Sequence, residues 1–485
     1  MTVAVRLKHW LRPERDPIGR LLIVAAVLAL GVVIGMQYMA PDKRMLAVMA
    51  GAVVFGIAWR LDTLTGIGFL LLALPYPRGT VFGSTNFAFI LFLLLIWLLR
   101  VTQRRSPPPT RTPLDIPIAG LVLAYAISFY NVSDLVSLGF AFQNTELFLV
   151  SQVMFYMVVS NVRTAQDLER LQMFQAVTIG TICLMAVFEL THPGGVLIPG
   201  WIEFRNTAGS DLYTRNVRVG GPFHDFEMLS EFCAISSLLI AFLIIRSRSL
   251  YRRVALSGLL LLDVFVLFAT VTRGGIVSLG VGLFYLLFLV RRRVNAVSLT
   301  LVGGSIAALA ALMNFYVSHF TRSGDVGARL RETTFVGVVP DSRVVAWRDG
   351  WNRFLEHPWI GHGPYYSQQT GTHVWFWPHN GYLYIANLVG LLGIAFYFAL
   401  LARLLMLSSH GSDDLRDPDY ARAFLTIANV QIVVFIVDQA KIDYLRNPIY
   451  QFEVWVLFAM LVSAYRLAYP ATAREPATRP LPVAA

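Results

Sequence analysis

The sequence predicts an all-α polytopic membrane protein with about 12–14 transmembrane helices. Of the 485 residues, 56% are hydrophobic and only 14% are charged, and the mean hydropathy is +0.60. Apolar runs of about 18–22 residues recur along the chain, and each is long enough to cross a hydrocarbon core of about 30 Å. Basic residues gather in the short connections between those runs. This pattern excludes an ordinary soluble globular protein.

About fourteen apolar runs are candidate spans. We expect them at residues 21–39, 45–60, 64–77, 81–100, 115–132, 146–161, 173–191, 227–245, 254–271, 274–290, 296–315, 380–405, 421–438 and 449–466. The first run follows a basic leader, and no small-residue cleavage pattern ends it, so we expect an uncleaved helix rather than a signal peptide. The third run is short, which leaves a merged or re-entrant segment as an alternative.

Arginine clusters in alternate connections predict the orientation. The clusters are Arg104–Arg105 with Arg111, Arg163 with Arg170, Arg246–Arg253 and Arg291–Arg293. Because cytoplasmic loops carry the excess of positive charge, these connections and both termini are expected in the cytoplasm. Two long loops, 192–226 and 316–378, then face the periplasm. We divide the chain into N-terminal transmembrane helices (1–190), a catalytic region (191–405), and C-terminal helices with a cytoplasmic tail (406–485).

The two long loops carry arginine against this general trend. The first contains Arg205, Arg215 and Arg218, and the second contains Arg322, Arg329, Arg331, Arg343, Arg348 and Arg353. Some of these side chains could be plain solvated surface, but guanidinium groups gathered at one membrane face suit a phosphate or diphosphate ligand. The net charge of +11 therefore reflects membrane topology and this cluster, and we expect no nucleic-acid partner.

Three arginine motifs lie in or beside these loops. Arg218 precedes Gly220–Gly221, where the bland interpretation is a loop-ending turn. Arg273 follows Thr272 in a tight helical hairpin and opens the next helix, so its alternatives are snorkelling and anion binding at free backbone N–H groups. Arg343 opens a segment with apolar residues at helical spacing, which predicts a short periplasmic surface helix. For Trp347, Trp351 and Phe354 of that helix we expect plain packing.

A histidine motif opens the twelfth expected span. His379 and Asn380 stand at its start, and Gly390 and Gly393 follow inside it. A histidine at a helix start is more often a cap or a hydrogen-bonded structural residue. Polar, titratable groups at a membrane boundary are nevertheless costly unless they serve a site, and a histidine can act as a base near neutral pH.

In this order the motifs resemble those of the O-antigen ligase/polymerase superfamily of bacterial envelope glycosyltransferases. The resemblance covers residues 215–405, and its most specific part is His-Asn-x9-Gly-x2-Gly at residues 379–393. Thr272 stands where a serine is usual before the hairpin arginine.

The resemblance implies a metal-independent, inverting enzyme of the bacterial inner membrane, without a cofactor. Its site would face the periplasm and move a glycan from an undecaprenyl-diphosphate carrier to an acceptor hydroxyl. Arg273, Arg343 and His379 would be catalytic, and Arg218, Arg273, Arg343 and Asn380 would bind substrate. The acceptor would be a growing glycan, as in O-antigen or exopolysaccharide polymerases, or lipid A–core, as in the ligases of lipopolysaccharide biosynthesis. Other polysaccharide assembly proteins are candidate partners.

A secondary transporter of an ion or a lipid-linked saccharide is the alternative from another class. It rests on Asp263, a carboxyl group in the middle of an expected span, because intramembrane acids mark transport paths. The two cysteines, Cys183 and Cys233, show neither metal-ligand nor disulfide spacing, so we interpret them as core residues.

Overall fold

The computed structural model describes residues 62–75, 85–192, 195–198, 202–203, 218–291, 296–320, 331, 335–336, 339–367, 369–370, 373–374 and 376–470. Among these residues, six helices are long and apolar enough to cross a membrane, and shorter apolar helices accompany them. The prediction of an all-α, multi-pass membrane protein is confirmed. The first two expected spans, 21–39 and 45–60, lie outside the described residues, so the total of 12–14 stays a prediction.

The helices follow the expected spans closely. They are α4 (Thr63–Ala73), α5 (Thr85–Thr102), α6 (Asp115–Ser128), α7 (Leu135–Asn161), α8 (Ala165–Thr191), α9 (Phe226–Arg246), α10 (Leu250–Ala269), α11 (Arg273–Val290), α12 (Ala296–Phe320), α14 (Asp341–Glu356), α15 (Gly381–Ser408), α16 (Tyr420–Gln439) and α17 (Pro448–Ala468). Short 3-10 helices are η1 (Phe129–Asn131), η3 (Gly221–Phe223) and η4 (Tyr444–Arg446).

Three small antiparallel hairpins lie in the long loops. Their strands are β1 (Val196–Ile198) with β2 (Ile202–Glu203), β3 (Phe335–Val336) with β4 (Val339–Pro340), and β5 (Gln369–Thr370) with β6 (His373–Val374). Strands of two or three residues add little to the core, so the fold depends on helix packing.

Two helices begin well before the apolar runs that predicted them. α7 begins at Leu135 rather than near residue 146, because Asp134 caps it by accepting a hydrogen bond from the Ser137 amide at 2.8 Å. α8 begins at Ala165 rather than near residue 173, where Thr164 and Asp167 form a reciprocal capping box. Hydropathy locates the apolar part of each helix, whereas capping residues set its start.

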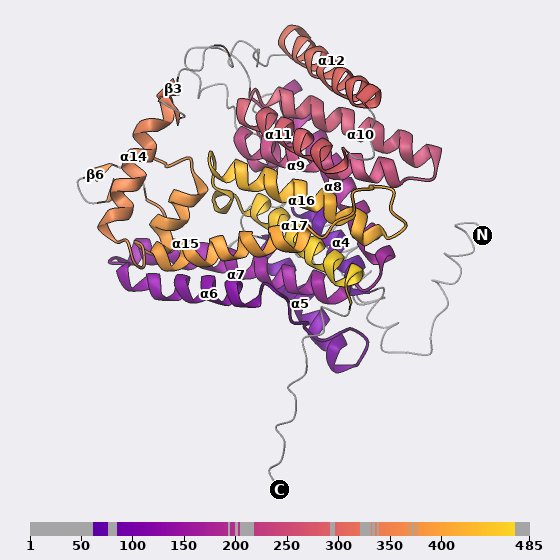
Figure 1. The fold of residues 1–485 in the computed structure, drawn as a ribbon. Coiled ribbons are helices and arrows are strands. Elements are labelled where there is room, and N and C mark those ends of the chain that lie inside the picture. Colours follow the sequence, from indigo (N-terminus) through magenta and orange to yellow (C-terminus); the bar gives the residue numbers. More distant parts are fainter. Residues whose placement is uncertain are drawn as a thin grey trace, which may run out of the picture.

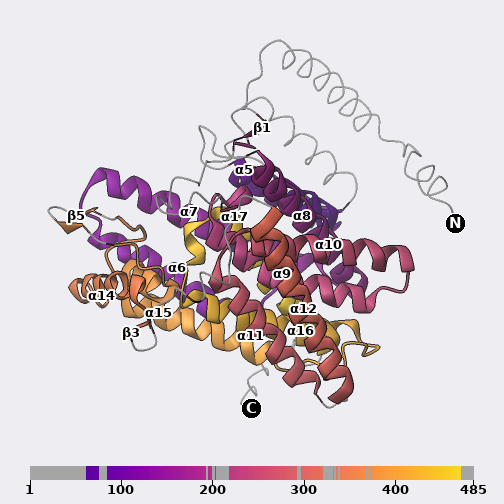
Figure 2. The same ribbon diagram turned by 90° about the horizontal axis from the view of Figure 1, so that it is seen from above.

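The C-terminal helices occupy the centre of the bundle. α16 contacts α9, α11, α15 and α17, while α17 also contacts α7 and α8. In the apolar stretch of α17, 89% of the residues are buried inside the protein, whereas in the apolar stretch of α11 the buried share is 22%. α11 is therefore less enclosed by the bundle than α17, and α12 packs on α10 (Figure 1). α14 lies at one end of the bundle, beside the start of α15, in both views (Figures 1 and 2).

The expected surface helix is confirmed as α14. Phe354 packs as predicted, with 6% exposure, and the Trp351 ring lies at a tilt against the Phe354 ring, although Trp351 is 51% exposed. The interpretation of Trp351 as a packing residue stays a prediction. Arg353 anchors the helix, because its guanidinium donates to the Ser367 carbonyl at 2.6 Å and lies over the Tyr366 ring.

A turn at residues 357–364 is hydrogen-bonded into a break in α15. Gly390 has φ 65°, so the helix is interrupted there. The amides of Leu391 and Leu392 donate to the carbonyls of Pro358 and Trp359, at 2.8 and 3.2 Å. A Cβ on Gly390 would lie 2.4 Å from the Trp359 main chain. The glycine is thus required by both its left-handed conformation and the close backbone approach.

The same turn holds His362 in a neutral state. Its Nε2 lies 2.7 Å from the Arg353 carbonyl, and burial lowers the pKa of the ring to about 4. The amide of His362 donates to the Asn387 carbonyl at 2.8 Å. These bonds tie α14 to α15, and so fix the start of α15 where the histidine motif lies.

Gly390→Ala should lower the free energy of unfolding by about 2–4 kcal/mol, because the methyl group forces strain and a main-chain clash. Gly280→Ala on α11 is the matched control, since a Cβ there meets nothing within 4 Å. Thermal unfolding in detergent measures both variants. Equal midpoints for Gly390→Ala and wild type would contradict the role given to this glycine.

Candidate functional site at one end of the bundle

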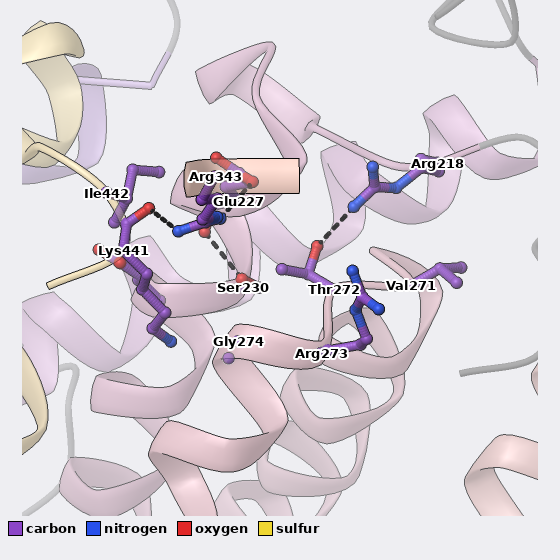
Figure 3. A pocket seen from close by; sticks show the side chains of 12 residues that line it. Arg218, Glu227, Ser230, Val271, Thr272, Arg273, Gly274, Arg343, Lys441 and Ile442 are labelled. Carbon is purple, nitrogen blue, oxygen red and sulfur yellow. Dashed lines mark hydrogen bonds and ion pairs between the residues drawn. The ribbon is translucent and has the colours of Figure 1, made fainter. Parts of the chain in front are cut away.

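A pocket at one end of the bundle gathers cationic side chains from four separate segments. Arg218 precedes η3, Arg273 opens α11, Arg343 lies on α14, and Lys441 follows α16. In Figure 3, Arg218 and Arg273 lie on either side of Thr272, and Arg343 and Lys441 lie across the pocket near Glu227. The three arginines predicted from sequence as site residues therefore line one cavity, although Arg218 and Arg343 are 125 positions apart in the chain.

Arg218 is the most enclosed of the three arginines. Its residue exposure is 8%, and its guanidinium donates to the Thr270 carbonyl at 3.2 Å and to the Thr272 hydroxyl at 3.1 Å. The guanidinium also lies 3.2 Å from the Phe226 ring centroid. Arg218 thus joins the segment before α9 to the α10–α11 turn and brings fixed positive charge to the pocket wall.

The turn between α10 and α11 presents a helix N-terminus to the pocket. Val271 has φ 51°, a strained conformation for a β-branched residue. Arg273 follows as the first helical residue, so the first backbone N–H groups of α11 lack intrahelical acceptors. A Cβ on Gly275 would lie 2.7 Å from Ser230 Cβ. The glycines let α11 approach α9 closely and keep its N-terminus accessible to an anion.

Glu227 lies at the centre of the site. Its carboxylate accepts from the Arg343 guanidinium at 3.2 Å, faces Nδ1 of His379 at 3.5 Å, and lies 3.8 Å from Arg446. One carboxylate in the first turn of α9 thereby connects α14, the start of α15 and η4. Its side chain is 20% exposed, so these ion pairs are partly shielded from solvent.

Arg343 both organises the site and faces the pocket. One amino group of its guanidinium donates to the Lys441 carbonyl and, at 3.4 Å, to the His379 carbonyl, and the other contacts Glu227. A guanidinium has five N–H donors, and among the described residues these contacts leave donors unused on Nε and on the second amino group. A ligand in the pocket can take those donors.

His379 is held with one nitrogen inward. Nδ1 is buried against Glu227, whereas the side chain as a whole is 37% exposed. Among the described residues no partner contacts Nε2, which leaves that nitrogen for a ligand. The residue has φ 45°, and backbone strain of this kind is tolerated where surrounding contacts impose it.

Asn380 caps α15. Its side-chain oxygen accepts from the Leu383 amide at 3.0 Å, and its amide nitrogen donates to the Ala440 carbonyl at 3.2 Å. Both ends of the side chain are thus engaged with the backbone, and the residue is 8% exposed. These contacts give Asn380 a positioning role for His379, and its direct contact with substrate stays a prediction.

The α16–α17 connection completes one wall of the site. Lys441 pairs with Asp438 and donates to the Ser278 hydroxyl. Burial raises the pKa of Asp443 to about 6, although Arg446 and a 2.8 Å hydrogen bond from Trp377 oppose this. Burial by itself lowers the pKa of Arg446, but Asp443, Asp225 and Glu227 raise it, so this guanidinium stays charged.

Sequence reasoning missed Glu227, Glu231 and Lys441. Glu227 begins an apolar run directly after the capping residue Asp225, where an acid is ordinarily explained by the helix dipole. Lys441 lies beyond the predicted catalytic region, in a short connection. These residues could have been found from their position, because they lie at helix ends on the membrane side where the arginine loops are expected. Polar groups there are costly unless they serve a site.

Asp263 and the two cysteines form a separate buried cluster. Their ligand atoms lie within 4.8 Å of one another. Cys183 contacts one Asp263 oxygen at 3.6 Å, and Ser237 donates to the other at 2.6 Å. The cysteines are core residues as predicted, but they also partner the acid. Both carboxyl oxygens of Asp263 therefore have protein partners, and the transporter alternative stays a hypothesis.

The comparison with protein families agrees with the motif analysis. Residues 256–398 match the model of the O-antigen ligase family, and this segment contains Arg273, Arg343 and His379. The resemblance to the O-antigen ligase/polymerase superfamily is thereby confirmed. A comparison with curated proteins found no match.

Glu227→Gln should lower the free energy of unfolding by about 1–3 kcal/mol, because two guanidinium groups and a histidine lose their shared counter-charge. Glu169→Gln is the matched control, since Glu169 pairs with Arg252 at 2.8 Å but is 38% exposed; exposed pairs contribute about 0–1 kcal/mol. Thermal unfolding in detergent compares them. A larger loss in Glu169→Gln than in Glu227→Gln would contradict the central role of Glu227.

Proposed function

We propose that this protein is a glycosyltransferase of the bacterial inner membrane that moves a glycan from an undecaprenyl-diphosphate carrier to an acceptor hydroxyl. The observation that carries the proposal is the convergence of Arg218, Arg273, Arg343 and Lys441 on one pocket beside His379. The O-antigen ligase match over residues 256–398 supports the same reaction class. With the basic connections in the cytoplasm, the pocket faces the periplasm.

The cationic wall suits the departing diphosphate. When the bond from the anomeric carbon to the carrier breaks, negative charge grows on the phosphate oxygens, and preorganised cations stabilise it. Arg273 and the α11 N-terminus lie on one side of the pocket, and Arg343 and Lys441 lie on the other. These groups supply the charge compensation that the reaction requires without the participation of a metal ion.

His379 is suited to accept the proton of the acceptor hydroxyl. Its Nδ1 faces Glu227, an arrangement that fixes the ring and favours a proton on that nitrogen. Nε2 is then the basic nitrogen. Attack by the acceptor on the face opposite the diphosphate inverts the anomeric carbon. Glu227 acts here as a positioning residue, because its carboxylate orients His379 and Arg343.

The acceptor divides the possible roles. We favour a polymerase, in which the acceptor is a second carrier-linked glycan, over a ligase that uses lipid A–core. Analysis of the lipid-linked glycans in a deletion strain distinguishes the polymerase from the ligase. Loss of a polymerase leaves single repeats on the carrier, whereas loss of a ligase leaves complete polymer on the carrier. Unchanged glycans would overturn both roles and favour the transporter alternative.

Arg273→Lys should reduce glycan transfer at least about tenfold, because lysine keeps the charge but loses the planar, bidentate donor pair. Transfer from a lipid-diphosphate-linked donor in proteoliposomes measures the effect. Arg252→Lys is the control, since Arg252 forms a partly exposed ion pair with Glu169, away from the pocket. Full activity of Arg273→Lys would mean that the site needs only positive charge and not diphosphate geometry.

His379→Asn should lower kcat about 10²–10⁴-fold, the usual effect of removing a general base. Asparagine tolerates positive φ and can cap a helix, so the backbone at φ 45° should be kept. The fall in kcat then measures the contribution of the imidazole ring. An active His379→Asn enzyme would remove His379 from the mechanism.

A further inference from the structure

A second glutamate lies inside the cationic pocket. Glu231 follows Glu227 by one helical turn on α9, on the same helix face, and it lines the cavity. The residue is 1% exposed, and the hydrogen-bonding side chain beside its carboxyl group is the hydroxyl of Tyr450 on α17. A buried acid in a pocket suited to a diphosphate requires an explanation, because as a carboxylate it would repel that ligand.

The surrounding charges do not give Glu231 a counter-ion of its own. It is faced by Glu227 on its own helix, by Asp438 from α16 and by Lys441 after α16. The hydroxyl groups of Tyr450 from α17 and Tyr397 from α15 and the more distant Arg446 guanidinium from η4 also face it. Lys441 is already paired with Asp438 and bonded to Ser278. Glu227 is balanced by Arg343 and Arg446. Within the described part of the chain, Glu231 forms no ion pair within 4 Å.

Burial without a paired cation favours the uncharged carboxylic acid. A buried carboxylate without a counter-ion carries a large desolvation cost, and the neutral acid avoids most of it. The neutral acid also offers an O–H donor to the cavity. A donor at this position matches the phosphate oxygens that the arginines would bind, so the protonated side chain and the cationic wall suit one ligand.

We propose that Glu231 is a catalytic acid that donates its proton to the diphosphate as the glycan leaves. This assignment rests on the proposed glycosyltransferase function. The bond between the anomeric carbon and the carrier oxygen breaks, and its electron pair goes to the diphosphate, which takes the Glu231 proton. The acceptor oxygen bonds to the anomeric carbon, and its proton goes to Nε2 of His379. Return of that proton to Glu231 through pocket water restores the enzyme, so atoms and charges balance.

Glu231→Gln tests proton donation directly. The amide keeps the size, the neutrality and an N–H donor, so KM for the lipid-linked donor should change less than about threefold, while kcat falls about 10²–10⁴-fold. Wild-type kcat should fall at high pH as the acid deprotonates, and the variant should lose that limb. Unchanged kcat and pH profile in Glu231→Gln would overturn the proposal, as would a raised KM with unchanged kcat.

Glu453→Gln is the matched control. Glu453 is also a buried glutamate of the bundle, 5% exposed, but it is bonded to Gln175 and lines a different cavity. Its replacement should leave the pH profile of transfer unchanged. If the high-pH fall in activity disappeared in Glu453→Gln and persisted in Glu231→Gln, the catalytic acid would be Glu453, and the proposal for Glu231 would be overturned.

An infrared measurement tests the protonation state without catalysis. Wild-type protein should show the carbonyl stretch of a protonated carboxyl group that shifts when inorganic pyrophosphate is added. Glu231→Gln should lack this pyrophosphate-sensitive band, and Glu453→Gln should retain it. Absence of the band in wild type overturns the assignment of Glu231. Absence of glycan transfer in wild type, with the band present, overturns the proposed reaction and leaves Glu231 as a protonated anion-site donor.

Discussion

The site depends on the ion pairs of a single carboxylate. Glu227 contacts Arg343 from α14, His379 at the start of α15 and Arg446 from η4. Each of these three partners is more than a hundred residues from Glu227 along the chain. The fold brings their segments together at one end of the bundle. Without Glu227, several cations would face one another across a partly buried space, and electrostatic repulsion would separate the segments that form the pocket. Because Glu227 already fixes the positions of these cations, an anionic ligand can bind to them without rearrangement of the site.

Backbone strain is concentrated around the same pocket. His224, Val271 and His379 all have positive φ, and each stands directly before or within a segment that supplies the site. Each such residue costs of order 1–3 kcal/mol, so other contacts must hold it. For His379 those contacts are the Asn380 cap and the turn at 357–364, which is hydrogen-bonded into the break of α15 at Gly390. Gly390 of the histidine motif thus belongs to the support of the site.

Hydropathy predicted nearly every described helix, because a span must be apolar over most of its length whatever surrounds it. The starts of α7 and α8 escaped this reasoning, since Asp134 and Thr164 set them through hydrogen bonds that an apolar window does not register. Within the site, Arg273, Arg343 and His379 stood out because their motifs occur in a fixed order. Glu227 and Glu231 did not, because an acid in the first turns of a helix has an ordinary explanation in the sequence, and only the fold places it opposite arginines from distant segments.

Charge balance in the pocket explains how these acids and bases can serve one reaction. Glu227 is fully engaged with cations and so fixes positions, while Asp438 holds Lys441 beside the glycines of α11. Arg218, Arg273 and Arg343 then leave the cavity with an excess of positive charge that a diphosphate would neutralise. Glu231 would cancel part of that excess if it were ionised, and the diphosphate would be bound more weakly. In the proposed reaction, a neutral Glu231 preserves the attraction and adds a proton where negative charge develops. Glu227, one helical turn earlier on α9, is paired with cations and fixes their positions, so the two acids would have opposite tasks because their partners differ.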